Sequence, residues 1–304
     1  MKQVSLAILA TGALLAALAT SALGQPAPTP DLPAWLYPPP PADGPAQASP
    51  AQEAPRFGPV DPHPGNHPPA PEVVAHGQKP EVWACGFCHL MNGQGHPENA
   101  PIAGLDVDYF KRAMGDFKSG ARKSSDPHPS RMVKIAQAMT DDQVAAAAEY
   151  FASVKYRPWV EVKEVDVAPV YRQAGMTLVA TGQTAPLGQQ ILEVPADPKL
   201  AASRDDESGF IAYVPKGSIA AGQALASGQG GVRGCTGCHG ADLEGTQRGP
   251  VLAGRSPSYI VRQLYDFKTG ARGGVRSQQM ARIVGSLSLD QMIALAAYSA
   301  SLKP

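Results

Sequence analysis

Two Cys-x-x-Cys-His motifs constrain this chain of 304 residues more than any other feature. The motifs consist of Cys85, Cys88 and His89, and of Cys235, Cys238 and His239. They lie 150 residues apart, and the same offset carries segment 116–122 onto segment 266–272. After a two-residue gap the offset becomes 148, which aligns Met132 with Met280. A repeat of this length predicts a duplicated domain and not the short unit of a solenoid.

The histidine after each cysteine pair helps to decide which kind of site the cysteines form. A Cys-x-x-Cys pair alone suits a zinc site, a redox dithiol or, in an exported protein, a disulfide framework. Zinc needs two more ligands per pair, and a dithiol gives no reason for a histidine in the next position twice. Two thiols on one helical turn can form thioether bonds to a haem, with the adjacent histidine beneath the iron. We therefore predict two covalent haem c groups on the four cysteines, with His89 and His239 as iron ligands.

The sixth iron ligand is expected later in each copy. Met132 and Met280 are the favoured residues, because each lies eight residues before a capping-box sequence. A lone methionine usually fills a core, but these two are paired by the repeat. The first copy offers further candidates, which are Met91, Met114, Met139, His96 and His128. His128 would give a bis-histidine iron of lower potential, whereas a thioether ligand raises the potential.

Helical signals recur at matched places in the two copies. Ser256 as a cap, Pro257 at the first position and Gly270 as a stop predict a helix, and its counterpart runs from Asp106 to Gly120. Capping boxes at 140–143 and 288–291 predict the last helix of each copy. Neither copy shows strand alternation. We expect two small all-α domains, at residues 75–157 and 217–304.

The N-terminal region is expected to carry export and spacing functions. Lys2, an apolar stretch and small residues near Gly24 predict a signal peptide over 1–24, with an uncleaved membrane anchor as the rival interpretation. Residues 25–74 hold more than half of the 31 prolines and predict an extended, disordered tether without a core. His63 and His67 lie in it and are expected to be solvent-exposed. Contact with a membrane is expected only if residues 1–24 remain attached.

The segment between the copies, residues 158–216, differs from both. It contains strand-like stretches at 160–167, 190–194 and 210–215, and five basic against eight acidic residues. The last domain from Gly217 carries nine basic and four acidic residues. We hypothesise that the insertion packs across the seam between the domains and that the basic domain faces an acidic partner. Solvated charge and a filler loop are the plain alternative. The whole chain balances 26 basic with 26 acidic residues, which removes the electrostatic argument for nucleic-acid binding.

These motifs together resemble the class I c-type cytochromes, and in particular the duplicated dihaem proteins of the cytochrome c4 type. The resemblance rests on the haem motif, on 249–254, on the Tyr259–Arg272 helix and on Gln279-Met280. It implies an all-α fold of two tandem cytochrome c domains with haem-centred helices. It also implies that the carbonyl of Pro250 orients His239, although the corresponding proline of the first copy, Pro101, lies one place later.

The function implied by the resemblance is that of a periplasmic electron carrier. Its expected partners are redox proteins, such as a dehydrogenase, an oxidase or a quinol-oxidising complex. No catalytic residue is expected, because two His/Met irons leave no position for a substrate. The alternative is a dihaem enzyme, resembling a thiosulfate dehydrogenase or a peroxidase, whose first-copy haem is open or differently ligated.

Overall fold

The computed structural model describes residues 33, 35–37, 54–126, 130–174 and 177–304. The predicted signal peptide or anchor at 1–24, half of the predicted tether at 25–74 and the alternative ligand His128 lie outside this part. Within it, no single helix is long and apolar enough to cross a membrane, while the bent pair formed by 277–284 and 289–301 meets the criteria of length and composition.

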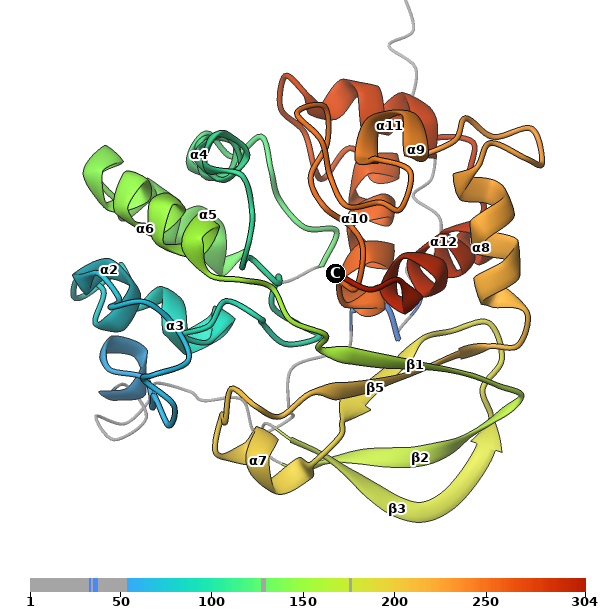
Figure 1. Ribbon diagram of the computed structural model, residues 1–304, viewed down its shortest axis with the longest axis horizontal. Coiled ribbons are helices and arrows are strands. Elements are labelled where there is room, and N and C mark those ends of the chain that lie inside the picture. Colours follow the sequence, from blue (N-terminus) through green and yellow to red (C-terminus); the bar gives the residue numbers. More distant parts are fainter. Residues whose placement is uncertain (1–32, 34, 38–53, 127–129, 175–176) are drawn as a thin grey trace, which may run out of the picture. The chain divides into compact units, whose positions relative to one another are not determined.

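The first copy is helical (Figure 1). Its helices are α3 (Cys85–His89), α4 (Val107–Lys118), α5 (Arg131–Ala138) and α6 (Asp141–Ser153). Asp106 caps α4 by accepting from the backbone of Tyr109, and the predicted capping box at 140–143 opens α6. The rings of Phe110 in α4 and Phe151 in α6 stack with centroids 6.2 Å apart. This stack pins the two longest helices of the copy together.

The second copy repeats this pattern with one more helix in front. Its helices are α8 (Ser218–Ala226), α9 (Thr236–His239), α10 (Pro257–Thr269), α11 (Ser277–Val284) and α12 (Leu289–Ser301). Ser256 caps α10, and Gly270 ends it with a φ of 77°, as predicted. Gly222 lets α8 press onto α12, because a Cβ there would lie 2.0 Å from the carbonyl oxygen of Ala294. The capping box at 288–291 is confirmed.

The insertion contains all five strands of the described residues and one short helix. These are β1 (Val160–Val165), β2 (Val167–Ala174), β3 (Thr177–Pro186), β4 (Leu192–Pro195), α7 (Pro198–Ala202) and β5 (Phe210–Pro215). Figure 1 shows β1 beside β5, and this pairing is parallel, while β4 adds antiparallel to the other edge of β5. The three strand-like stretches are therefore confirmed.

The separate β2–β3 hairpin was not expected from the sequence. Its first strand contains Pro169, which removes a ladder donor, and the pairing register shifts between Pro169 and Tyr171. The second strand contains Gly182, which weakens a strand signal. Hydrogen bonding between the two strands of the hairpin outweighs the effects of Pro169 and Gly182 against strand formation.

The insertion contacts both copies. The indole of Trp159 donates to the carbonyl of Gly95 in the first copy at 3.1 Å. The carboxylate of Glu193, in β4, accepts from the hydroxyl of Ser256 in the second copy at 2.8 Å and from the backbone of Ser258. The hypothesis that this segment packs across the seam agrees with these hydrogen bonds.

The expectation of a tether without a core is wrong for residues 54–74. This part forms a 3-10 turn, η1 (Ala54–Phe57), and a helical turn, α2 (Glu72–Ala75), so packed structure begins before residue 75. Val73 and Val74 are buried in the core of the first copy. Proline prevents a regular helix but not the packing of side chains between prolines.

The two histidines of this segment are not equally exposed. The side chain of His67 is 3% exposed and contacts the hydroxyl of Tyr150 at 2.9 Å, which contradicts the expectation of a solvent-exposed ring. His63 is one third exposed. Further upstream, Leu36 is buried and the hydroxyl of Tyr37 donates to Asp266 at 2.6 Å.

The two copies meet through reciprocal arginine–tyrosine contacts. Arg122 of the first copy donates to the hydroxyl of Tyr259 at 3.0 Å, and Arg272 of the second donates to that of Tyr109 at 2.7 Å. Gln263 lies between them, and its carbonyl oxygen accepts from both guanidinium groups at 2.8 Å. The segments that carry the arginines also pair through an antiparallel bridge. Residues that are 150 positions apart in the sequence thus make equivalent contacts across the junction between the copies.

A second arginine link has no counterpart in the repeat. Arg255 is 3% exposed and donates to the carbonyls of Pro101 and Ala103 in the first copy, at 3.0 and 2.7 Å. Its guanidinium lies 4.0 Å from the ring centre of Tyr156. The matched residue of the first copy is Leu105, so this contact exists in one direction only.

We expect Tyr109→Phe to lower the free energy of unfolding by about 2 kcal/mol, because it removes the acceptor of a charge-assisted hydrogen bond and leaves a donor of the partly buried Arg272 without this partner. Guanidinium unfolding of the haem-loaded protein measures this value. Tyr171→Phe, in the β2–β3 hairpin, is the matched control and should change the value by less than about 0.5 kcal/mol. Equal effects of the two substitutions would show that the contact between the copies does not contribute.

Candidate haem sites

Each predicted iron ligand is held by a backbone carbonyl across a short loop. The Nδ1 atom of His89 lies 2.7 Å from the carbonyl oxygen of Ala100, and that of His239 lies 2.7 Å from the carbonyl oxygen of Pro250. A carbonyl can only accept, so Nδ1 carries the proton and Nε2 keeps the lone pair that can bind iron. The expected role of the Pro250 carbonyl is confirmed as a hydrogen bond.

The first copy makes the same bond without a proline at that position. Ala100 is the residue that the 150-residue offset pairs with Pro250, while Pro101 follows it. The contact therefore depends on the position of the loop backbone and not on the side chain. Sequence comparison of the two copies could have identified Ala100 from the offset alone.

Both histidines are buried, at 9% and 6% exposure for His89 and His239. Burial lowers the pKa of both rings, and the hydrogen bond from Nδ1 only partly offsets this effect. The neutral imidazole is thus the stable form near pH 7. Neutral imidazole is also the form that ligates a metal, so the electrostatic setting fits the predicted role.

The four cysteines are partly buried and are not joined by disulfides. Burial raises the pKa of the Cys85 thiol to about 12 and that of Cys88 to about 11, and it also raises the pKa of Cys235. A reactive dithiol requires a lowered pKa, so the redox-dithiol interpretation loses support. Among the described residues, no group of three His, Cys, Asp or Glu ligands includes a cysteine, which also weakens the zinc interpretation.

The structure places both favoured methionines on matched helices. Met132 lies in α5 and Met280 in α11, and each is partly buried. The side-chain amide of Gln279 lies 3.7 Å from the sulfur of Cys238, which brings the helix of Met280 next to the second attachment motif. The sequence places Gln279 only as the neighbour of Met280 and predicts no contact for it. Iron ligation by either methionine stays a prediction.

The other candidates of the first copy have packing roles. Met91, Met114 and Met139 are at most 6% exposed and belong to its hydrophobic core. The ring of His96 meets that of Phe210 edge-on with centroids 5.6 Å apart. These contacts make Met132 the one partly exposed methionine among the candidates in the described part of the first copy.

The loop opposite His239 leaves no room for a side chain. A Cβ added at Gly249 would lie 2.8 Å from Cε1 and 2.9 Å from Nδ1 of His239. A glycine is therefore required for the close approach of this loop to the imidazole. The tight cradle supports a fixed ring orientation, as an iron ligand needs.

We expect Gly249→Ala to displace the His239 ring and to reduce the fraction of chains that carry a low-spin haem in the second copy. Visible spectra of the reduced and oxidised protein, with haem counted per chain, measure this fraction. Gly237→Ala, inside the same attachment motif, has no atom within 4 Å of the added Cβ and is the control. Spectra of Gly249→Ala identical to those of the control would contradict the proposed cradle.

Comparisons with known proteins agree with this geometry. Residues 219–303 match the family described as cytochrome c. Cytochrome c4 of Azotobacter vinelandii is 25% identical over 222 residues, which cover 70% of this chain and 82% of the relative. A protein named thiosulfate dehydrogenase electron acceptor, from Stutzerimonas stutzeri, is 25% identical over 229 residues, which cover 74% of this chain and 82% of that protein.

A solved structure of thiosulfate dehydrogenase (TsdBA) from Marichromatium purpuratum, in its as-isolated form, is 25% identical with a TM-score of 0.48. The similarity covers 73% of this chain and 37% of that chain. The two sequence matches given above are each longer than either copy, whereas the cytochrome c family match falls within the second copy. Taken with the hydrogen-bonded histidines in both copies, these matches show that the chain resembles the dihaem class I cytochromes of the c4 type and carries covalently bound haem c.

Proposed function

We propose that this electron-transfer cytochrome is a periplasmic carrier between a donor dehydrogenase or quinol-oxidising complex and a terminal acceptor. The observation that carries the proposal is the Nδ1–carbonyl bond of 2.7 Å, made by His89 and again by His239. Each haem, when bound, supplies reversible one-electron chemistry at its iron. Cysteines 85, 88, 235 and 238 attach the two groups, the two histidines are the proximal ligands, and Met132 and Met280 are the distal ligands.

The protein side chains have positioning roles in this scheme. The carbonyls of Ala100 and Pro250 orient the imidazoles and increase the donor strength of Nε2. Met132 and Met280 would complete the two ligand sets, so no position would stay open for a substrate. The two copies are proposed to be separate haem domains, at 75–157 and 217–304, with 158–216 as the connection.

The contacts between the copies support electron exchange within one chain. Arg122 and Arg272 hold the copies together through partners in the opposite copy. Arg122 is 7% exposed, so breaking this contact would leave a buried charge without its partners. A stable arrangement of the copies favours a constant path for the electron.

We propose export because residues 1–24 have the pattern of a signal peptide. The haem domains would then lie in the periplasm. An uncleaved anchor at these residues would leave the same domains on the outer side of the inner membrane.

A second candidate concerns the donor. The relative from Stutzerimonas stutzeri is named as an electron acceptor of thiosulfate dehydrogenase, and the solved structure from Marichromatium purpuratum is named as that enzyme. We propose thiosulfate dehydrogenase as one donor to test. An enzymatic role of the first copy itself would need a distal ligand other than Met132, and His128 is the named alternative.

We expect Met280→Ala and Met132→Ala each to remove one methionine-to-iron charge-transfer band in the red region of the oxidised spectrum. The band depends on the thioether ligand, and the loss of that ligand lowers the potential of the affected haem. Met139→Leu, a buried core methionine in the first copy, is the matched control and should keep both bands. Retention of both bands in Met132→Ala would assign the first-copy ligand elsewhere and would favour the enzymatic alternative.

The exposed charge of the second copy supports an acidic partner. Its exposed basic residues are Arg233, Arg248, Lys268, Arg276, Arg282 and Lys303, and its exposed acidic residues are Asp242, Glu244 and Asp290. The surface excess is smaller than the sequence count, because three basic residues, Arg255, Arg262 and Arg272, donate to groups of the first copy, while Asp266 is the one acidic residue that is not exposed. Arg276 and Arg282 flank Met280 on or next to α11 and lie nearest in sequence to the proposed ligand.

We expect the double variant Arg276→Gln, Arg282→Gln to slow electron exchange with an acidic redox protein by about threefold or more at low ionic strength, since opposite charges accelerate encounter. Stopped-flow rates over a salt series measure the effect. Lys303→Gln removes a charge at the end of the chain and is the control. Rates that do not fall as salt is raised would refute the acidic partner.

A further inference from the structure

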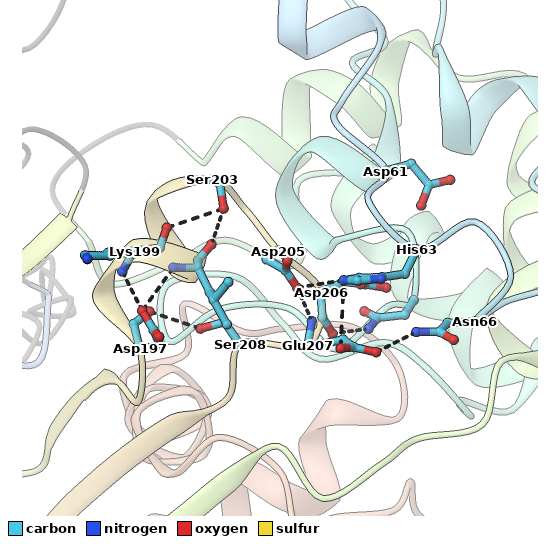
Figure 2. A network of polar contacts seen from close by, with 12 residues as sticks. Asp61, His63, Asn66, Asp197, Lys199, Ser203, Asp205, Asp206, Glu207 and Ser208 are labelled. Atoms are coloured by element: carbon cyan, nitrogen blue, oxygen red, sulfur yellow. Dashed lines mark hydrogen bonds and ion pairs between the residues drawn. The ribbon is translucent and has the colours of Figure 1, made fainter.

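A histidine and three acidic residues meet on the first-copy side of the insertion, outside both haem sites. Figure 2 shows His63 facing the consecutive residues Asp205, Asp206 and Glu207. The Nε2 atom of His63 lies 3.1 Å from Asp205 Oδ1 and 3.9 Å from Asp206 Oδ1. The ligand atoms of these three residues all lie within 4.8 Å of one another. This spacing matches a set of donors around one cation.

The carboxylate of Asp206 gives the second and decisive observation. Its side chain is 2% exposed, and neither of its oxygens has a hydrogen-bond partner in the described part of the chain. A buried carboxylate without a partner is unstable unless a cation or a proton neutralises it. The nearby Arg157 makes no hydrogen bond to these oxygens: its guanidinium donates to the backbone carbonyl of Asp206 at 3.2 Å and favours the charged carboxylate only through space.

The backbone around Asp206 holds this carboxylate in place. Asn92 of the first copy donates to the same carbonyl at 2.8 Å. The backbone of Glu207 donates to Asp205 Oδ1 at 2.9 Å, and Asn66 donates to Glu207 at 3.0 Å (Figure 2). The loop is thus ordered by groups other than the free carboxylate oxygens. Such an arrangement resembles a prepared metal site more than a flexible acidic surface.

We propose that His63, Asp205 and Asp206 form a binding site for a divalent transition cation of the Zn²⁺ type. One imidazole nitrogen with two carboxylates suits Zn²⁺, whereas Ca²⁺ and Mg²⁺ prefer sites made of oxygen. His63 is one third exposed, which gives the cation access from solvent. The side chain of Glu207, 3.9 Å from His63 Nε2, is available to complete the ligand set.

The site would join two segments that are distant in sequence. His63 belongs to the segment before α2, and the two aspartates belong to the loop between α7 and β5. In the same loop, Arg204 donates to the carbonyl of Phe87 and lies 4.9 Å from the centre of its ring. Phe87 stands between Cys85 and Cys88 in the first haem motif. A bound cation would therefore hold the N-terminal segment and the insertion against this motif.

Isothermal titration of the untagged, chelator-treated, haem-loaded protein with ZnCl₂ tests the site. We expect one Zn²⁺ per chain and a rise in the temperature of unfolding when it binds. His63→Gln and Asp206→Asn should each weaken binding by more than about tenfold. His76→Ala removes an exposed histidine outside the cluster and should leave the affinity unchanged.

Two results would overturn the site. One is the absence of Zn²⁺ binding by the parent protein, which would leave His63 and the carboxylates as an ion pair. The other is binding that His63→Gln leaves intact. Visible spectra establish that each variant still carries two haems, and His63→Gln alone decides the question if Asp206→Asn does not fold. A failure here would not affect the electron-transfer proposal, since none of these residues is a predicted haem ligand.

Discussion

The hydrogen bond between a buried imidazole and a backbone carbonyl is the interaction on which both haem-binding copies depend. In each copy the acceptor lies eleven residues after the histidine, so a loop of the same length closes over the motif. The bond fixes the tautomer, and burial keeps the ring neutral. Both effects leave the lone pair of Nε2 available to bind a metal. The histidines at the ends of the short helices α3 and α9 are held by this loop.

Charge buried between the copies gives the molecule its second constraint. Arg122 and Arg255 are nearly inaccessible, and each donates to groups of the opposite copy. Asp266 is also buried, and it accepts from the backbone of Ser125 and the hydroxyl of Tyr37. Buried charges that have hydrogen-bond partners in the opposite copy favour this arrangement, because any other would leave those bonds unmade. The junction is therefore more selective than an apolar contact of similar size.

The residues outside the repeat connect its parts. The insertion contacts both copies, through Trp159, which directly precedes β1, and through Glu193 in β4. The proline-rich segment contributes Val73 and Val74 to the core of the first copy and brings His63 to the acidic loop. The insertion and the proline-rich segment thus make specific contacts, although their composition alone suggests unstructured linkers. Burying the Asp206 carboxylate without a hydrogen-bond partner is energetically unfavourable. This is the reason for proposing a cation there.

The sequence by itself determined the haem motifs, the duplication, the limits of α4 and α10, and the starts of α6 and α12. These features are local: Cys85 to His89 is one turn of helix, and Ser256, Gly270 and the two capping boxes act on backbone groups within a few residues. Tertiary structure decided which groups meet across long separations. It paired Arg122 with Tyr259, buried His67, formed the β2–β3 hairpin and brought His63 to Asp205 and Asp206. Contacts of this kind depend on how surfaces pack, and no periodicity or spacing in the chain encodes them.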